Sequence, residues 1–150
     1  MPVRVQSEDF DLGHELDALR KGRTDVGALV SFSGLVRDLD DGGLREMELE
    51  HYPGMTQRAL EEILAQAKDR WALQAGLIIH RYGVLRPGDQ IMMVAAASRH
   101  RQNAFDAANF MMDYLKSRAP FWKKERHGHG ESWVAAKKED EAARNRWTKE

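Results

Sequence analysis

Positively charged side chains gather where one stretch of the chain has to turn. Five lysines and arginines lie within eleven positions, at Lys116, Arg118, Lys123, Lys124 and Arg126. Pro120 lies among them and cannot continue a helix, and it also disfavours the helical conformation at Ala119. The chain is therefore expected to turn between Lys116 and Lys123, so that two ammonium groups converge, as in a binding site for an anion.

The alternative is that this cluster is only a solvated face, with Asp113 paired to Lys116 at the i+3 position of a helix. Charge alone does not separate the two interpretations. Phe121 and Trp122 interrupt the cluster, and a flat apolar surface beside ammonium groups favours a planar anionic ligand. Because the formal net charge of the whole chain is only -1, any anion site must be local.

A second basic group lies at a predicted junction between a strand and a helix, in the segment Ser98-Arg99-His100-Arg101. The free N–H groups and the dipole at a helix start favour an anion, and His100 and Arg101 add directional donors. Local capping by His100, with the arginines as surface charges, is the alternative interpretation. The spacing leaves both open.

Three helices are expected to position these groups. The first follows Asp11 and ends at Gly22, and the second follows Thr56, as its cap, to about Trp71. The third follows Ser98, its predicted N-cap. Its apolar stripe is predicted at helical spacing, at Ala104, Phe105, Ala108, Met111, Met112 and Leu115.

Apolar and alternating runs predict strands at Val3 and Val5, and over residues 26–36, 44–52, 77–85, 90–97 and 132–136, with a short basic strand before the last. The segment DLDDGG predicts a hairpin with a mobile tip between the second and third strands, with Arg37 at the end of the first of these two strands, and RPGD predicts a tight turn. Helices and strands do not alternate regularly. We therefore expect an α+β fold with a mostly antiparallel sheet.

Composition excludes several classes of site. No cysteine is present, which removes disulfides, thiolate metal ligands and a cysteine nucleophile. His127 and His129 flank a glycine but have no second ligand pair, so no metal site is predicted. The start has no apolar signal core and the apolar run 91–97 is too short to span a bilayer, so a soluble cytoplasmic protein is expected. Length predicts one domain over residues 1–150, with a charged tail over 137–150.

Several long motifs in order make the chain similar to a known family. VGALVSFSGLVRD, LEHYPGM, IHRYGVLRPGD, SRHRQNAFDAANFMMDYLKSRAPFWKKE and SWVAA resemble the large, catalytic subunit of molybdopterin synthase over nearly the whole chain. The resemblance implies an α/β hammerhead type of α+β fold, a homodimer, and a small ubiquitin-like partner at each end, giving a heterotetramer. It implies sulfurtransferase activity without cofactor or metal: two sulfurs pass from the partner's C-terminal Gly-Gly thiocarboxylate to cyclic pyranopterin monophosphate, forming the molybdopterin dithiolene.

The resemblance also implies roles for particular residues. Lys116 of YLK and Lys123 of PFWK match the family's catalytic lysines, and His100 and Arg101 match a pair that reaches across the dimer. The substrate-binding positions it implies are Leu35, Val36, Arg37, His100, Arg101, Lys116, Lys123, Lys124 and Glu125. Phe32 and Met112 match positions that border the pocket, although a core role fits them equally well. The loop His127 to Gly130 receives no role.

These positions suggest a hypothesis for the reaction. Arg37, His100, Arg101 and Lys123 hold phosphate and pterin, while Lys116 meets the incoming C-terminus and assists sulfur attack by charge stabilisation and proton transfer. Phe121 and Trp122 are candidates to pack near the passage of the partner's tail. The competing interpretations are a module that binds single-stranded nucleic acid through the same patch, and a scaffold that has kept only the fold and the dimer.

Overall fold

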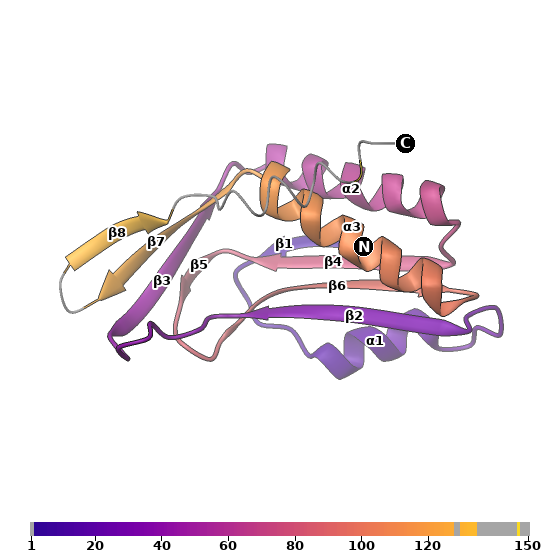
Figure 1. The fold of residues 1–150 in the computed structure, drawn as a ribbon, viewed down its shortest axis with the longest axis horizontal. Helices are drawn as coiled ribbons and strands as arrows, with labels where there is room; N and C mark the ends of the chain where they lie inside the picture. The colour runs from indigo at the N-terminus through magenta and orange to yellow at the C-terminus, as the bar shows by residue number, and fades with distance from the viewer. Residues whose placement is uncertain (1, 128–129, 135–146, 148–150) are drawn as a thin grey trace.

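The computed structural model describes residues 2–127, 130–134 and 147. Its helices and strands follow the order β1 (Val3–Gln6), α1 (Leu12–Arg20), β2 (Ala28–Leu35), β3 (Leu44–His51), α2 (Met55–Trp71), β4 (Ala75–Arg81), β5 (Gly83–Leu85), β6 (Gln90–Ser98), α3 (Arg101–Arg118), β7 (Phe121–His127) and β8 (Gly130–Val134) (Figure 1). A large sheet has the strand order β1-β4-β6-β2, and a small sheet has the order β5-β3-β7-β8. β1 pairs with β4 in parallel and the other pairs are antiparallel, which confirms the α+β prediction.

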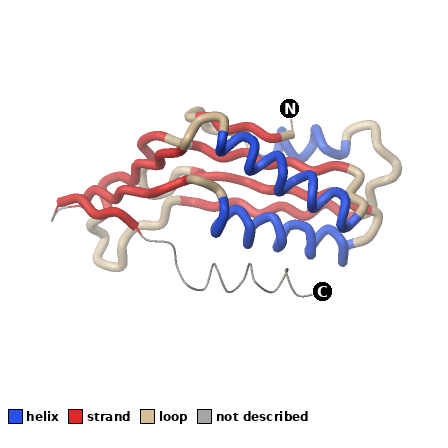
Figure 2. Tube along the Cα trace, turned by 90° about the horizontal axis from the view of Figure 1, so that it is seen from above, coloured by secondary structure: helices blue, strands red, loops and turns tan. Residues whose placement is uncertain are grey.

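Helices cover both faces of the large sheet. α2 and α3 lie side by side on one face, and α1 lies on the other (Figures 1 and 2). Because strand side chains alternate between faces, Ile78 of β4 joins the core under α2 and α3, while Leu77 and Ile79 join the core over α1. β4 and β6 are thus buried on both sides. Within the described residues no helix is long and apolar enough to cross a membrane.

The predicted helices are present, but two of the three predicted caps are wrong. Asp11 caps α1 as predicted, since its Oδ1 accepts a hydrogen bond of 2.9 Å from the His14 N–H. Ser98 is instead the buried last residue of β6, and His100 takes the N-cap position of α3. Thr56 is fully buried inside the first turn of α2. The serine and threonine face the core, so their hydroxyls cannot serve the helix ends.

The apolar stripe of α3 is correct in direction and wrong in one member. Ala104, Ala108, Met111 and Leu115 are buried as predicted. Phe105 is 54% exposed. The helix turns other side chains inward in its place, at Ala107, Phe110 and Tyr114. A large aromatic surface is therefore left on the outside of α3.

Two predictions about strands are also wrong. The run 77–85 is not one strand, because Gly83 with φ +94° turns the chain from β4 in the large sheet to β5 in the small sheet. The predicted hairpin of residues 26–36 with 44–52 does not form: β2 pairs with β6, and β3 pairs with β5 and β7. The DLDDGG segment therefore connects two sheets. The last predicted strand starts at Gly130, and residues 135–136 lie outside the described part of the chain.

Trp147 lies against the two long helices. Its ring makes edge contacts with Trp71 and Phe110, with centroids 5.6 and 5.8 Å apart. Its Nε1 donates to Asp113 Oδ2 at 2.5 Å, and its carbonyl accepts from Arg70 at 3.1 Å. Asp113 therefore has a partner in addition to any contact with Lys116.

A glycine before β2 allows a close approach that fixes the start of α3. A Cβ added to Gly27 would lie 2.2 Å from the backbone oxygen of Arg99, and the Gly27 N–H donates to Ser98 O at 2.9 Å. Gly27→Ala is expected to lower the free energy of unfolding by about 1–3 kcal/mol, because backbone must move to accommodate the methyl group. Urea denaturation measures this difference.

Gly13→Ala in α1 is the matched control, since its nearest contact would be at 3.6 Å. It is expected to leave stability unchanged or raise it by up to about 1 kcal/mol, because alanine is the better helix former. Equal stability of the two variants would contradict the role given to Gly27.

Candidate functional site

A short turn joins α3 to β7 and lies between two predicted site lysines, Lys116 and Lys123. The helix ends where the Ala119 N–H donates to Leu115 O at 3.2 Å, and the Phe121 N–H then donates to Ala119 O at 2.8 Å. Ala119 is extended, with φ -68° and ψ 132°, as expected before a proline. Lys116 therefore lies in the last turn of the helix, while Lys123 lies near the start of the strand that follows.

A buried histidine lies beneath both lysines. His80 of β4 is 4% exposed, and its ring stacks on Phe121 with centroids 3.7 Å apart and planes at 18°. Burial lowers the pKa of His80 to about 3; the positive charges of Lys123 and Lys116, and of His51 when it is protonated, act in the same direction, and the hydrogen bond to Arg81 opposes them. The end of α3 and the start of β7, which carry these two lysines, form one candidate site.

His51, the last residue of β3, lies beside Phe121, its cross-strand partner. Its ring centroid is 4.6 Å from that of Tyr82 and 5.8 Å from that of Phe121. Burial lowers its pKa. Its Nδ1 is buried without a hydrogen-bond partner in the part of the chain that the structure describes. Two uncharged imidazoles thus flank the residue that opens β7.

The alternation of β7 separates the basic cluster into two faces. Lys123 and Glu125 face the same side as their cross-strand partners Leu49 and Met47, which are 1% and 7% exposed. Lys124 and Arg126 face the opposite side. The sequence run KKER therefore does not form one continuous basic surface.

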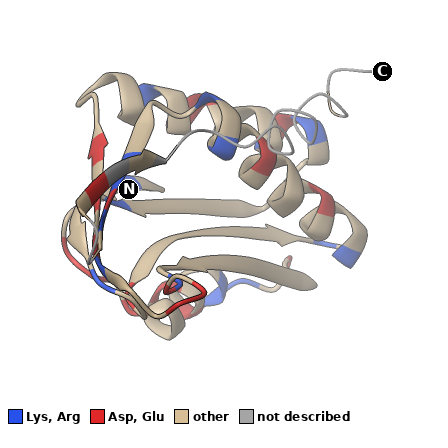
Figure 3. Cartoon of the chain, turned by 60° about the vertical axis from the view of Figure 1, so that its left-hand side comes forward, with Lys and Arg blue, Asp and Glu red and all other residues tan. Residues whose placement is uncertain are grey.

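The outward face of the small sheet is an ion-pair network. Arg126 contacts Glu46 and Glu48 at 2.7 Å each and Glu131 at 3.0 Å, and Lys124 Nζ lies 3.0 Å from Glu131. Acidic and basic side chains mix along these strands (Figure 3). For Lys124 and Arg126, the solvated-face interpretation describes the arrangement well.

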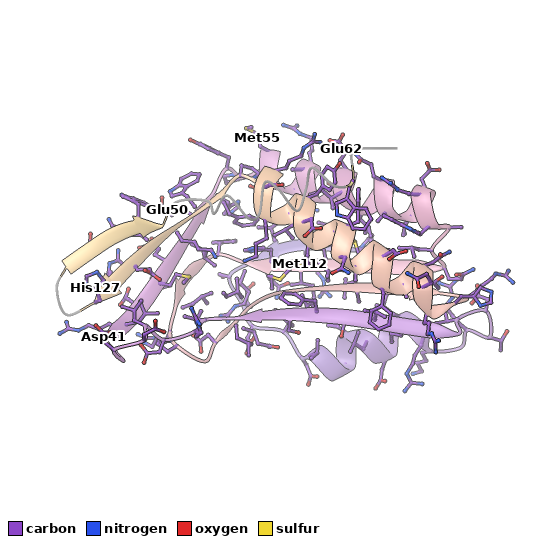
Figure 4. The ribbon with its side chains drawn as sticks, in the orientation of Figure 1. Asp41, Glu50, Met55, Glu62, Met112 and His127 are labelled. Carbon is purple, nitrogen blue, oxygen red and sulfur yellow. The ribbon has the colours of Figure 1, made fainter. Side chains whose placement is uncertain are left out.

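Trp122 also faces outward. Its Nε1 donates to Glu50 Oε2 at 2.9 Å, and its ring packs against Tyr52 with centroids 4.8 Å apart. Glu50 and Met55 lie near the junction of β3 with α2 (Figure 4). Tyr52 and Met55 are 56% and 55% exposed, so an apolar surface lies beside the lysine site.

The predicted residues after β2 lie at the same end of the large sheet as His80. Leu35 pairs with Gln90 and His80 pairs with Met92, two positions away on β6. Leu35 is 57% exposed, Val36 is 2% exposed, and Arg37 follows as an exposed residue. The backbone of Val36 is held on both sides, by Asp89 O and by the Gly88 N–H, at 2.8 Å each.

Phe32 and Met112 differ in their surroundings. Phe32 is 45% exposed on β2, so the alternative core role is wrong for it. Met112 is partly buried and packs against the main core from the middle of α3 (Figure 4). A core role therefore fits Met112.

His100 and Arg101 lie at the opposite end of α3 from Lys116. A helix rises about 1.5 Å per residue, so roughly 22 Å separates Arg101 from Lys116 along the axis. His100 occupies the N-cap position without a capping hydrogen bond from its side chain, and both residues are exposed. One copy of the chain does not bring these residues to the two lysines.

A hollow in the surface lies elsewhere. It has a volume of about 430 Å³ and is lined by Leu39, Asp41, Gly42, Gly43, Leu44, Arg45 and His127. It lies at the end of β3 and β7 that is remote from Phe121 (Figure 4). Across the described ranges, no group of three His, Asp or Glu side chains is arranged to hold a metal ion. His129 lies outside those ranges.

Sequence reasoning missed His80 and His51 as parts of the site. A signal for His80 was available, because it follows three consecutive buried apolar residues, Leu77, Ile78 and Ile79. A histidine in such a run is buried at a cost and needs a local reason. His51 carried no comparable signal in its alternating strand.

Acidification is expected to destabilise the fold through His80. Its pKa falls from 6.5 to about 3 on folding, so between these values the unfolded chain binds more protons and the free energy of unfolding decreases as pH falls. At about 1.4 kcal/mol per pKa unit, the full contribution is roughly 5 kcal/mol. His80→Phe removes the titrating group, so urea denaturation from about pH 6.5 to about pH 4.5 should show a flatter profile for this variant. His14→Phe, at an exposed histidine, should keep the wild-type slope; equal slopes for all three proteins would contradict the assignment.

Comparison with known proteins agrees with this architecture. The family described as MoaE protein matches residues 5–118. A molybdopterin synthase catalytic subunit from Ralstonia nicotianae is 59% identical over 146 residues, which cover 97% of this chain and 83% of that protein. The solved molybdopterin biosynthesis MoaE protein from Burkholderia ambifaria is 52% identical, with a TM-score of 0.84 over 99% of this chain and 98% of that chain.

A more distant solved structure has the same fold. Molybdopterin synthase from Staphylococcus aureus is 27% identical, with a TM-score of 0.80 over 87% of this chain and 95% of that chain. Family match, high identity along nearly the whole chain and structural similarity agree. The chain therefore belongs to the MoaE family of molybdopterin synthase catalytic subunits.

Proposed function

We propose that the chain transfers two sulfurs from the thiocarboxylated C-terminus of a small ubiquitin-like partner to cyclic pyranopterin monophosphate, forming the dithiolene of molybdopterin in the cytoplasm. The observation that supports this most strongly is the turn after α3, which places Lys116 in the last turn of that helix and Lys123 close to Phe121, the residue that stacks on the buried His80. The relatives named above carry the name of the catalytic subunit of that enzyme. No cofactor enters the proposed reaction.

The charges of the two substrates explain why such a site is needed. The precursor carries a cyclic phosphate and the partner's tail ends in a thiocarboxylate, so the two anions repel each other as they approach. Lys123 holds the phosphate end of the precursor, and Lys116 meets the partner's tail. Lys116 stabilises the charge that develops during sulfur attack and assists proton transfer. Arg37, at the same end of the large sheet, contributes to phosphate binding.

A second copy of the chain completes the site. Because His100 and Arg101 lie roughly 22 Å from Lys116 along α3, they act on the lysines of the neighbouring copy in a homodimer. β2 is an edge strand of the large sheet, and Phe32 on it and Phe105 on α3 are 45% and 54% exposed. These apolar side chains suit burial against a second copy. A small subunit at each end completes a heterotetramer.

The remaining positions stay predictions within this proposal. Leu35, Val36, Lys124 and Glu125 are assigned to the substrate, with Phe32 and Met112 at the border of the pocket. Lys124 faces away from Lys123, so its role would be to neutralise charge at a distance. Residues 1–150 act as one domain, with 137–150 as a tail.

A nucleic-acid-binding module is disfavoured by the same geometry. Single-stranded nucleic acid needs an extended basic groove with stacking aromatic side chains. Here Lys124 and Arg126 are paired with glutamates, and Phe121 is stacked on His80. Intact lysines at positions 116 and 123 likewise favour an enzyme over a scaffold.

Removing either lysine should abolish most of the activity. Lys116→Ala and Lys123→Ala are each expected to slow single-turnover sulfur transfer by about 10²-fold or more, because a preorganised cation is lost from the site. The measurement mixes the chain with thiocarboxylated small subunit and the cyclic precursor, and quantifies molybdopterin by the fluorescence of its oxidised form. Lys68→Ala, at an exposed lysine of α2, should match the wild type. Near-normal rates in Lys116→Ala would refute the assignment.

A mixture of two inactive variants should recover activity only if the two substituted residues come from different copies of the chain at each site of the dimer. After denaturation and refolding as a 1:1 mixture, Arg101→Ala and Lys116→Ala are expected to recover about a quarter of wild-type activity, since half of the dimers are mixed and each has one intact site. A mixture of Lys116→Ala with Lys123→Ala is the control. Both of these lysines come from the same chain, so no intact site forms. Equal recovery in both mixtures, or recovery in neither, would contradict the shared site.

A further inference from the structure

We propose that His80 is a positioning residue for the lysine site: its ring, held by the Arg81 carbonyl, supports Phe121 and so fixes the turn that places Lys116 beside Lys123. This inference rests on the proposed function, because it assigns a task in that reaction. His80 itself does not contact the reacting atoms. It acts through Phe121.

The stack joins the two sheets at the point where the site is formed. His80 lies on β4 of the large sheet, and Phe121 lies on β7 of the small sheet. The two rings are nearly parallel, with centroids 3.7 Å apart. Phe121 also follows directly on the turn after α3, and its ring centroid lies 5.8 Å from that of His51, its cross-strand partner in β3. The start of β7 is thus held between residues of both sheets.

A hydrogen bond fixes the orientation of the His80 ring. Its Nδ1 lies 2.7 Å from the Arg81 carbonyl oxygen. A carbonyl oxygen only accepts, so Nδ1 carries the proton and Nε2 carries the lone pair. Rotation of the ring would break this bond in a buried environment, at a cost for each unpaired polar group. The face that supports Phe121 is therefore defined.

An uncharged ring is required here. The groups that act on His80 are Lys116, Lys123, the His51 ring, the backbone of Arg81 and its own burial. A protonated imidazole would repel the ammonium groups of both lysines and displace them from the site. The neutral ring supports the turn without adding charge.

Displacement of Phe121 would be transmitted directly to the site. Lys123 is two residues further along β7 and projects to the same face as Phe121. Lys116 is one helical turn before the extended Ala119. A shift of about 1 Å in a positioning element can cost about 10²-fold in rate, so a modest relaxation of the stack is sufficient to impair catalysis.

The first test is a double-mutant cycle in the sulfur-transfer assay. His80→Ala and Phe121→Ala are each expected to lower kcat by about tenfold or more with KM changed less than about twofold, and the double variant should be no worse than the poorer single variant. His80→Phe, which keeps a flat ring, should recover most of the lost kcat. Ile79→Val is the control, because it loosens the same buried strand on the opposite face, toward α1, and should keep wild-type kcat. Unchanged kcat in His80→Ala, or losses that multiply in the double variant, would overturn the proposal.

A second measurement does not depend on activity. In the wild type, the ¹⁵N spectrum of the His80 imidazole should show the Nδ1–H tautomer, and the ¹³Cε signals of Lys116 and Lys123 should shift in both His80→Ala and Phe121→Ala but not in Ile79→Val. An Nε2–H tautomer, or lysine signals that do not respond, would refute the positioning role. Failure of the wild type to transfer sulfur would instead refute the proposed function, while these spectra would still decide the question of positioning.

Discussion

The contact between His80 and Phe121 is the constraint on which the arrangement of the site depends. The two residues belong to different sheets, which share no strand. Phe121 is the first residue of β7 and directly follows the turn after α3. Pro120 ends the helix, but a proline alone does not determine where the following strand goes. The buried, uncharged ring gives that strand a fixed starting point, and the positions of Lys116 and Lys123 follow from it.

The distribution of charge shows why only part of the basic sequence cluster forms a site. On the outer face of the small sheet, glutamates from β3 and β8 neutralise Lys124 and Arg126. On the inner face, Lys123 lies opposite the buried Leu49. Alternation along one strand thus separates the ion-paired surface from the candidate anion site. The length of α3 adds a second separation, since it places Arg101 too far away to act within the same chain.

The sequence predicted those features that depend on nearby residues. The second helix was predicted to end at about Trp71, where α2 ends, Asp11 was identified as a cap, and Pro120 as a turn. Features set by distant partners were not predictable in this way. Ser98 and Thr56 are residue types that often cap helices, but both side chains are buried in the core. The predicted hairpin does not form because β2 pairs with β6, more than fifty residues later in the chain.

The same distinction between nearby residues and distant partners applies to the candidate site. The motif resemblance identified the two lysines, and the residues between them predicted that the chain turns there. The stack of His80 on Phe121 joins positions far apart in the sequence, so neither residue alone revealed it. A crystal structure of the chain with cyclic pyranopterin monophosphate tests the central claim most directly. The account predicts that the phosphate lies between Lys123 of one copy and His100 and Arg101 of a second copy, with the pterin extending toward Lys116. A phosphate bound in the hollow beside Arg45 and His127, remote from both lysines, would contradict it.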